Sequence, residues 1–425
     1  MSLVTRRAFF AQASQLAALP WLAARLAARL AAPSPVSESR ALILLWLDGG
    51  CSHLDTFDPK RAAPSEVRGP FDTIESAIEG VDLCARLPRL AALLDRLVLL
   101  RGLSSGEGNH DRAASFLLTG HRPSATLTSP GWPCWLSDEG AFDPRSPLPS
   151  YVALPAAPNG ARAGFLPVSR GPIEMALDLA HARLSLPNLE PRPGTETSRA
   201  LAARLDALDG APRSLAELAR DRFRAQALAI SQSREAREAL DLKLEPAELR
   251  ARYGAHLAGQ GLLAARRLVE RGTRAVLVHW DGWDHHREIG EALGYGFPPR
   301  LDALDQSVSA LHEDLEQRGL LERVVVAVAT EFGRTPRLNL QGGRDHWPRA
   351  SCALLFGAGL RRGVVHGATD ARGEEPLDEG LAPPRVGATI LAALGLDPAQ
   401  EFPAPNGRPI PLIEKGQAPI REVLA

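Results

Sequence analysis

The chain has 425 residues, of which 45% are hydrophobic and 23% are charged, and these values are ordinary for a globular protein that buries a core. Its 49 basic and 50 acidic residues give a formal net charge of −1, which argues against nucleic acid or an anionic membrane as a partner. The balance is uneven, because residues 1–32 carry four arginines and no acidic residue.

The N-terminal residues 1–32 are typical of an export signal. Arg6 and Arg7 fit the twin-arginine pattern, and an apolar stretch at 16–24 follows them. The alternative is an amphipathic first helix, because two further arginines lie unusually close to the apolar stretch. We predict a twin-arginine signal and a periplasmic or secreted mature protein. No later segment approaches the ~20 apolar residues that span a bilayer.

The mature chain alternates between apolar runs that predict strands and periodic runs that predict helices. Strands are expected at 42–47, 97–100, 275–278, 324–329 and 352–356, and helices at 112–118, 300–318 and 384–394. The Pro-, Gly- and Ser-rich text at 123–193, which includes Tyr151–Leu154, is interpreted as irregular lining or a lid. Residues 197–270 are interpreted as a helical insertion. Because the strands are apolar throughout, we predict one α/β domain over 33–425, with a mostly parallel sheet between two helical layers.

The chain has four cysteines, at positions 51, 84, 134 and 352, and they show no CxxC or zinc-finger spacing. In an oxidising compartment one or two disulfides could form, but the sequence does not pair them. Cys51 stands close to Asp48, so it could instead be a free thiol beside the site.

Carboxylates and imidazoles stand beside the predicted strands, and six of the 11 histidines belong to this group. The candidate metal ligands are Asp48, Asp284, His286, Glu331, Asp345 and His346. Side chains at the carboxyl ends of parallel strands meet at one edge of a sheet, where they can hold metal. Imidazole with carboxylate favours zinc or manganese over calcium or magnesium. Asp345 could be a ligand or could hydrogen-bond a ligating imidazole, and two ions would suit displacement at phosphorus or sulfur.

Two arginines lie within these motifs. Arg334 and Arg344 could each donate two hydrogen bonds to a tetrahedral oxyanion, because a guanidinium is planar and forked. The alternative is that each arginine holds a loop by binding a carboxylate. A triad of Ser52, His53 and Asp55 is disfavoured, because residues so close in sequence rarely adopt triad geometry.

With these motifs the chain resembles the secreted family known as domain of unknown function 1501, which is similar to sulfatases and looks like a branch of the alkaline phosphatase superfamily. The resemblance spans nearly the whole mature chain, and its most specific pieces are 331–336 and 343–348. It implies an alkaline-phosphatase-like α/β/α sandwich, a metal pair and a nucleophile at the start of the helix after the second strand. By position, Asp48 and Glu331 resemble ligands of one ion, and Asp284, His286 and His346 resemble ligands of the other.

The chain departs from the superfamily at two of these positions. Phe332 stands where the superfamily has a ligating histidine, and His53 or His110 could replace it. No cysteine or serine stands at the helix start, where Asn109 and His110 are found instead. Either a serine of the preceding loop, Ser104 or Ser105, is the nucleophile, or water activated by a divalent ion attacks directly, with His110 as general base, ligand or nucleophile. We therefore expect catalytic roles for Asn109, His110 and Arg334, and substrate binding by His53, Arg112, Arg334 and Arg344.

These features predict an exported, metal-dependent hydrolase of sulfate or phosphate esters that acts on a small or polymeric anionic substrate and uses two ions. The alternative is a non-catalytic metal-containing protein that binds anionic carbohydrate or a partner at the cell surface.

Overall fold

The computed structural model describes residues 40–137, 148–185, 233–291 and 297–425. The predicted signal at 1–32 and the first half of the predicted insertion, 197–232, lie outside the described residues. None of the helices in the described part of the chain is long and apolar enough to cross a bilayer.

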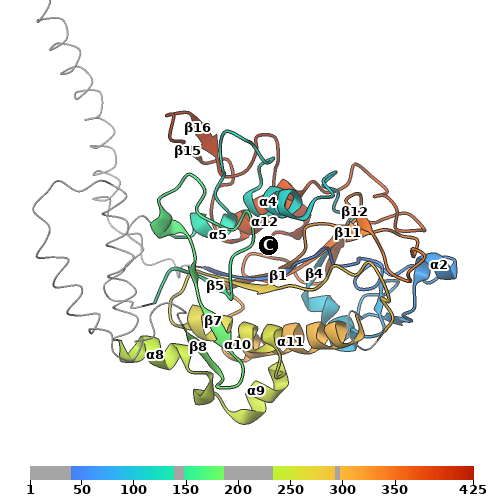
Figure 1. Ribbon diagram of the computed structural model, residues 1–425, viewed down its shortest axis with the longest axis horizontal. Coiled ribbons are helices and arrows are strands. Elements are labelled where there is room, and N and C mark those ends of the chain that lie inside the picture. Colours follow the sequence, from blue (N-terminus) through green and yellow to red (C-terminus); the bar gives the residue numbers. More distant parts are fainter. Residues whose placement is uncertain (1–39, 138–147, 186–232, 292–296) are drawn as a thin grey trace, which may run out of the picture. The chain divides into compact units, whose positions relative to one another are not determined.

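A central sheet organises the domain, and in the described residues it has eight strands (Figure 1). In order across the sheet they are β14 (Val364–His366), β4 (Val98–Arg101), β13 (Cys352–Gly357), β10 (Val324–Ala329), β1 (Ala41–Leu47), β9 (Ala275–Trp280), β5 (Tyr151–Leu154) and β6 (Ile173–Glu174). The pairings from β10 through β1, β9 and β5 to β6 are parallel. Only β13 runs antiparallel to both of its neighbours in this sheet. The sheet is therefore mostly parallel.

Helices cover both faces of this sheet (Figure 1). One face carries α3 (Pro88–Leu93), α10 (Leu257–Glu270) and α11 (Pro298–Gln317), and the other carries α4 (His110–Thr119), α5 (Trp132–Trp135) and α12 (Pro383–Ala393). The side chains of β1 alternate between them: Ile43 and Leu45 pack in the core under α10 and α11, and Leu44 and Trp46 pack under α4 and α12. Because both faces are covered, the whole of β1 is apolar and buried. The predicted three-layer α/β architecture is confirmed.

Apart from the α-helices between residues 233 and 254, the remaining elements are short and lie around this sandwich. They are the strand pairs β2 (Thr73–Glu75) with β3 (Asp82–Cys84), β7 (Ala176–Asp178) with β8 (Arg183–Ser185), β11 (Gly333–Arg334) with β12 (His346–Trp347), and β15 (Glu401–Pro403) with β16 (Pro409–Pro411), and the helical turns α2 (Ser65–Arg68), η1 (Leu94–Arg96), η2 (Val168–Arg170), η3 (Leu242–Leu244) and η4 (Arg421–Val423). The four cysteines are free and buried, so the disulfides considered from the sequence are not formed.

The five strands and three helices expected from the sequence are present, with bounds shifted by no more than a few residues. The stretch 123–193 was expected to be irregular, but it supplies two strands of the central sheet, β5 and β6. Tyr151–Leu154, expected in irregular structure, forms β5 and pairs in parallel with β9. Prolines and serines surround the short apolar run 151–154 and are typical of a loop. The run is a strand because it pairs with β9, which lies far away in the sequence and is not visible in the local pattern.

The described part of the predicted insertion contains α8 (Arg234–Leu240), α9 (Ala247–Tyr253) and α10. Its end belongs to the sandwich, because α10 packs in the core under the sheet. The fully buried Arg266 of α10 forms ion pairs with Glu245 at 2.9 Å and with Asp314 of α11 at 2.8 Å. Buried charge of this kind must be paired, so the network holds the segment after residue 233 against α10 and α11.

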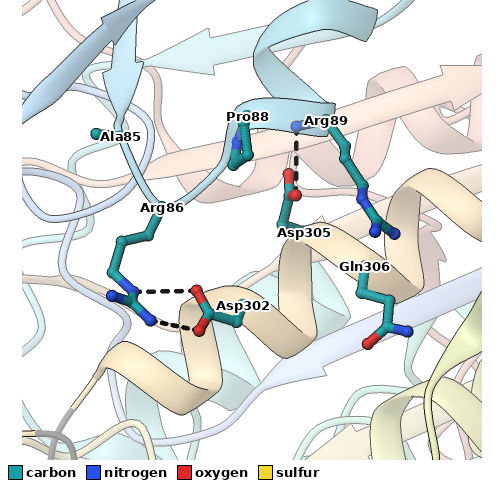
Figure 2. Close-up of a pocket in the computed structure, with 7 residues that line it drawn as sticks. All are labelled: Ala85, Arg86, Pro88, Arg89, Asp302, Asp305 and Gln306. Carbon is teal, nitrogen blue, oxygen red and sulfur yellow. Dashed lines mark hydrogen bonds and ion pairs between the residues drawn. The ribbon is translucent and has the colours of Figure 1, made fainter.

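A surface groove of about 450 Å³ lies where α3 begins beside α11 (Figure 2). Arg86 pairs with Asp302 there, and Asp305 accepts hydrogen bonds from the backbone N–H groups of Arg89 at 3.2 Å and Leu90 at 2.8 Å. The charged groups of this groove are thus largely engaged with one another. None of the site residues predicted from the sequence lines it.

The topology brings the sequence motifs to one edge of the sheet. The parallel strands β10, β1 and β9 all end there, so the residues that follow them are neighbours. Because β13 is antiparallel, its amino end reaches the same edge, with His346 just before it. The loop after β4 leads there into α4, which begins at His110.

Candidate metal centre

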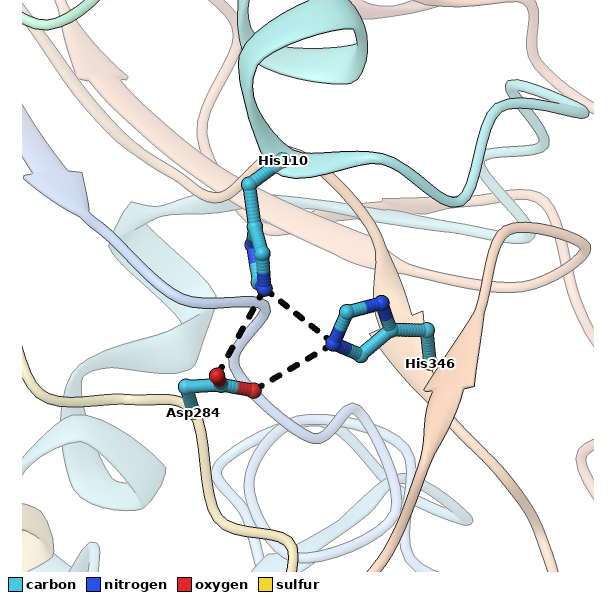
Figure 3. A group of neighbouring side chains, drawn as sticks. All are labelled: His110, Asp284 and His346. Atoms are coloured by element: carbon cyan, nitrogen blue, oxygen red, sulfur yellow. Dashed lines mark hydrogen bonds and ion pairs between the residues drawn. The ribbon is translucent and has the colours of Figure 1, made fainter.

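Four side chains from three segments of the chain come together at this edge. Asp284 and His286 come from the loop after β9, His346 from β12 and His110 from the first position of α4. Figure 3 shows His110, Asp284 and His346 directed toward one another. One ligand atom from each of these three residues lies within 4.8 Å of the other two.

The distances within this cluster match a metal coordination sphere. His346 Nε2 lies 3.1 Å from Nε2 of His110 and 3.1 Å from Nε2 of His286. Asp284 Oδ1 lies 3.0 Å from His286 Nε2 and 3.4 Å from His346 Nε2, and Asp284 Oδ2 lies 3.6 Å from His110 Nε2. Ligands at about 2.0–2.1 Å from a tetrahedral zinc ion are separated by about 3.3 Å. One ion could therefore be shared by His110, Asp284 and His346, whose ligand atoms lie within 4.8 Å of one another, with His286 beside His346.

The other ring nitrogen of each histidine faces an oxygen acceptor. His110 Nδ1 lies 2.6 Å from Glu331 Oε1, His286 Nδ1 lies 2.8 Å from Asp345 Oδ1, and His346 Nδ1 lies 2.8 Å from the carbonyl oxygen of Gly108. Each neutral ring therefore carries its proton on Nδ1 and has a lone pair on Nε2. In this tautomer the Nε2 atoms of His110 and His286 face Nε2 of His346, which is the arrangement of nitrogen donors that a cation requires. The donor set fits a divalent metal ion.

Two predicted ligands lie behind these histidines. Glu331 is buried, and its carboxylate accepts hydrogen bonds from His110 Nδ1, from Gly49 N at 2.9 Å and from Thr330 Oγ1 at 3.1 Å. Asp345 accepts from His286 Nδ1 in the same way. Both carboxylates thus orient a ring, the second of the two roles foreseen for Asp345. For Glu331 this contact differs from the direct ligation expected from the sequence.

Asp48 lies at the end of β1 with different partners. It accepts a hydrogen bond from Trp46 Nε1 at 2.8 Å, and its Oδ2 lies 3.4 Å from His279 Nε2. These contacts outweigh the effect of burial, so the pKa of Asp48 is lowered. The contacts of Asp48 and Glu331 do not define a second ion, and the two-ion arrangement stays a prediction.

Arg334 is fully buried and is bonded to the protein. Its Nε donates to Gly50 O at 2.7 Å, its Nη1 donates to Arg344 O at 3.1 Å, and its Nη2 donates to Gly49 O and to Asp284 Oδ1. Its remaining Nη1 hydrogen faces His286 Nε2 at 3.4 Å. All the N–H groups of Arg334 are therefore engaged within the protein, and none is free for the contact with a substrate oxyanion expected from the sequence. Arg334 instead holds the proposed ligand Asp284.

Arg344 is also fully buried, and it forms an ion pair with the buried Asp55. Its Nε lies 2.6 Å from Asp55 Oδ2, and its Nη1 donates to the carbonyl oxygens of Thr335 and Pro336. The substrate role expected for Arg344 is therefore replaced by the alternative considered from the sequence, an arginine that holds a loop by binding a carboxylate.

The other predicted substrate and catalytic residues lie around the start of α4 or in the core. Asn109 caps α4, because its side chain accepts a hydrogen bond from the backbone N of Arg112 at 3.2 Å. The Arg112 side chain faces solvent and pairs with Glu107 at 2.8 Å. His53 is buried, with Nε2 2.9 Å from Gly373 O, so it does not reach a substrate. His110 joins the cluster, as foreseen among its possible roles.

Charge and burial set the protonation of the cluster. Burial raises the pKa of Asp284, but the hydrogen bond and charge of Arg334 outweigh it, and the net pKa is lowered. The hydrogen bond to Glu331 raises the pKa of His110 above its ordinary value of 6.5. Burial lowers the pKa of His346. Asp284 is therefore ionised at neutral pH, and His110 takes up a proton more readily than His346 does.

We expect metal binding by the cluster to weaken as the pH falls through the raised pKa of His110, because a protonated imidazole cannot bind an ion. Glu331→Gln removes the anion that raises this pKa, so the weakening should begin at a lower pH. The stability of the metal-free protein depends on pH in the opposite direction from metal binding. The contact between charged His110 and Glu331 stabilises the folded state fully below pH 6.5, and this contribution is lost as the pH rises through the raised pKa of His110. Metal titration from pH 5 to 8 tests this. The same midpoint in both proteins would contradict it.

Two partners of the cluster were not predicted from the sequence. One is the backbone carbonyl of Gly108, which no side-chain pattern can reveal. The other is Asn339, whose side chain donates to Asp345 Oδ1 at 3.1 Å and to His286 O at 2.8 Å. Its position between the two most specific motifs was the one available signal.

Comparison with known proteins gives a family and similar structures. A family model described as "Protein of unknown function (DUF1501)" matches residues 39–424. The sequence matches no curated protein. A sulfatase from Pseudoalteromonas sp., PsFucS1, is 12% identical and aligns over 84% of this chain and 68% of its own, with a TM-score of 0.39. An alkaline phosphatase from the Antarctic bacterium TAB5 is 10% identical and aligns over 84% of this chain and 98% of its own, with a TM-score of 0.37.

Proposed function

The chain belongs to the DUF1501 family, and we propose that it is a metal-dependent hydrolase of sulfate or phosphate esters. One observation carries the proposal: Nε2 of His346 lies close to the Nε2 atoms of the two other histidines and to the Asp284 carboxylate, while every Nδ1 is held by an oxygen acceptor. Histidines fixed in this way by a partner on the other nitrogen are typical of metal ligands.

We assign one divalent ion to His110, Asp284, His286 and His346, and the donor set favours zinc or manganese. When bound, such an ion supplies Lewis acidity toward an ester oxygen. Glu331 and Asp345 keep the Nδ1 protons in place, and Arg334 keeps Asp284 ionised and oriented. The Asp284 and His286 side chains are 45% and 42% exposed, which leaves the centre open to a substrate from solvent.

Water is the nucleophile that best suits this arrangement. The residues at the start of α4 carry no hydroxyl: Asn109 caps the helix, and both nitrogens of His110 are engaged. The Ser105 hydroxyl is directed to its own loop, where it lies 3.2 Å from Glu107 O. We therefore propose direct attack of water on the ester rather than a covalent intermediate on serine. Ser104 is the other serine predicted from the sequence as a nucleophile. If water attacks directly, replacement of Ser104 by alanine should leave the activity unchanged.

A second candidate is a non-catalytic protein that uses the metal to bind an anionic carbohydrate or a partner. It is favoured by the burial of Arg334 and Arg344, which leaves neither guanidinium for the oxyanion. The hydrolase would act on a small or polymeric anionic ester, and the binding protein would hold an anionic carbohydrate or a partner at the cell surface. In both cases we propose that the chain works outside the cytoplasm after twin-arginine export.

The test combines metal content with ester hydrolysis. We expect the protein purified without chelator to hold about one equivalent of zinc or manganese and to hydrolyse 4-nitrophenyl sulfate or phosphate. Asp284→Asn keeps the shape but removes the charge, so it should lose both metal and turnover. Bound metal without turnover of either ester would favour the binding protein. Two equivalents would support the second ion, and absence of metal uptake would overturn both candidates.

A further inference from the structure

Asn339 lies outside the set of proposed ligands, in the loop that separates the β11 and β12 motifs. Its side-chain amide uses every hydrogen-bonding position it has. Nδ2 donates to His286 O at 2.8 Å and to Asp345 Oδ1 at 3.1 Å. Oδ1 accepts from the backbone N of Gln341 at 3.0 Å and of Gly343 at 3.0 Å. One end of the amide thus shapes its own turn, and the other end binds the proposed metal centre.

The two Nδ2 contacts act on the same histidine. Asp345 Oδ1 accepts from both Asn339 Nδ2 and His286 Nδ1, so its position is fixed from two sides. The backbone carbonyl of His286 is held by the same Nδ2. Asn339 therefore holds the main chain of His286 directly and its ring through Asp345.

The loops that Asn339 joins are in backbone contact. A Cβ atom on Gly343 would lie 2.1 Å from the carbonyl carbon of His286 and 2.1 Å from the N of Arg287, so the loops pass too closely for any side chain. Asn339 N also donates to Gly343 O at 2.8 Å. One of these loops carries His286 and the other leads to His346. Their spacing sets the distance between the two Nε2 atoms.

We propose that Asn339 is a positioning residue that fixes His286 against His346 in a geometry and tautomer ready for a metal ion. The proposal rests on the proposed metal centre for its consequence, but the tautomer of His286 can be measured without metal. Removal of such a partner behind a ligand typically costs 10–100-fold in metal affinity or activity.

Two substitutions separate positioning from shaping the turn. Asn339→Asp keeps an acceptor for the N–H groups of Gln341 and Gly343 but loses both Nδ2 contacts and sets a second carboxylate against Asp345. Asn339→Ala loses all four side-chain hydrogen bonds of the amide. The matched control is Asn406→Asp, because Asn406 accepts from the backbone N of Arg408 at 3.0 Å in an exposed turn on another loop.

We expect both Asn339 variants to bind Zn²⁺ about 10–100-fold more weakly than the parent and the Asn406 variant. Imidazole ¹⁵N NMR of the metal-free proteins should show His286 as the Nδ1–H tautomer in the parent and as a mixture in both variants. Normal Zn²⁺ binding and tautomer in Asn339→Asp would overturn the inference and limit Asn339 to its turn. If the parent binds no metal, the proposed function fails, and the tautomer result alone decides whether Asn339 positions the ring.

Discussion

Replacing His346 by alanine should abolish metal binding and lower kcat/KM for ester hydrolysis by more than about 100-fold, beyond the usual effect of losing a group behind a ligand. His346 is the central member of the cluster, because its Nε2 lies 3.1 Å from both other histidine Nε2 atoms. The folded state should survive, since the ring makes one hydrogen bond to the backbone, from Nδ1 to Gly108 O, and its Nε2 contacts are only with the partly exposed residues of the cluster. The loss of that bond costs about 1 kcal/mol.

The measurement is metal content and steady-state kinetics, with thermal unfolding of the metal-free proteins as the test of folding. His121→Ala is a matched control, because His121 also binds backbone carbonyls, those of Pro411 and Leu412, but lies outside the cluster. The control should keep its metal and its activity. If His346→Ala retained both as well, the convergence of the three rings would not be the functional centre.

The layers of the fold could be predicted from the sequence because local patterns encode them. The run 324–329 is apolar at every position, and β10 has the predicted bounds. The direction of a strand is not local: nothing in Cys352–Gly357 indicates that β13 is antiparallel, because a buried strand is apolar in either direction. β5 was missed for a related reason, since its place beside β9 depends on a partner more than 100 residues away.

The candidate site could be predicted as a set of residues but not as a set of roles. His286 and His346 were recognisable, because imidazoles beside strands meet at a sheet edge. Glu331 was expected on the ion, yet it binds His110 Nδ1, a difference of a few ångströms that spacing cannot resolve. Arg334 had the residue type of an oxyanion ligand, and only its burial shows that its N–H groups are engaged. The role of a side chain depends on which of its donors and acceptors remain free after the protein has folded, and the sequence alone does not contain this information.

Replacing Asp55 by alanine should lower the free energy of unfolding by about 3–5 kcal/mol, because it leaves the Arg344 guanidinium buried without a counter-charge. Both side chains of this ion pair have no exposed surface, and two hydrogen bonds, of 2.6 Å and 3.2 Å, join them. The pair links the loop after β1 to the loop that carries His346. Metal affinity should therefore fall together with stability, since the Arg344 carbonyl also holds Arg334.

Urea denaturation of the metal-free variants measures the cost, with Asp302→Ala as the matched control. Asp302 pairs with Arg86 through two hydrogen bonds as well, but these side chains are 54% and 39% exposed, and such pairs contribute about 0–1 kcal/mol. Equal small losses in the two variants would show that water reaches Asp55 and that the loops are held by other contacts. We expect a large loss in Asp55→Ala alone. The double substitution Asp55→Leu with Arg344→Met should recover it, because apolar pairs of similar size often replace buried ion pairs without loss of stability. Such a recovery would assign the cost to an uncompensated buried charge rather than to the loss of the ion pair itself.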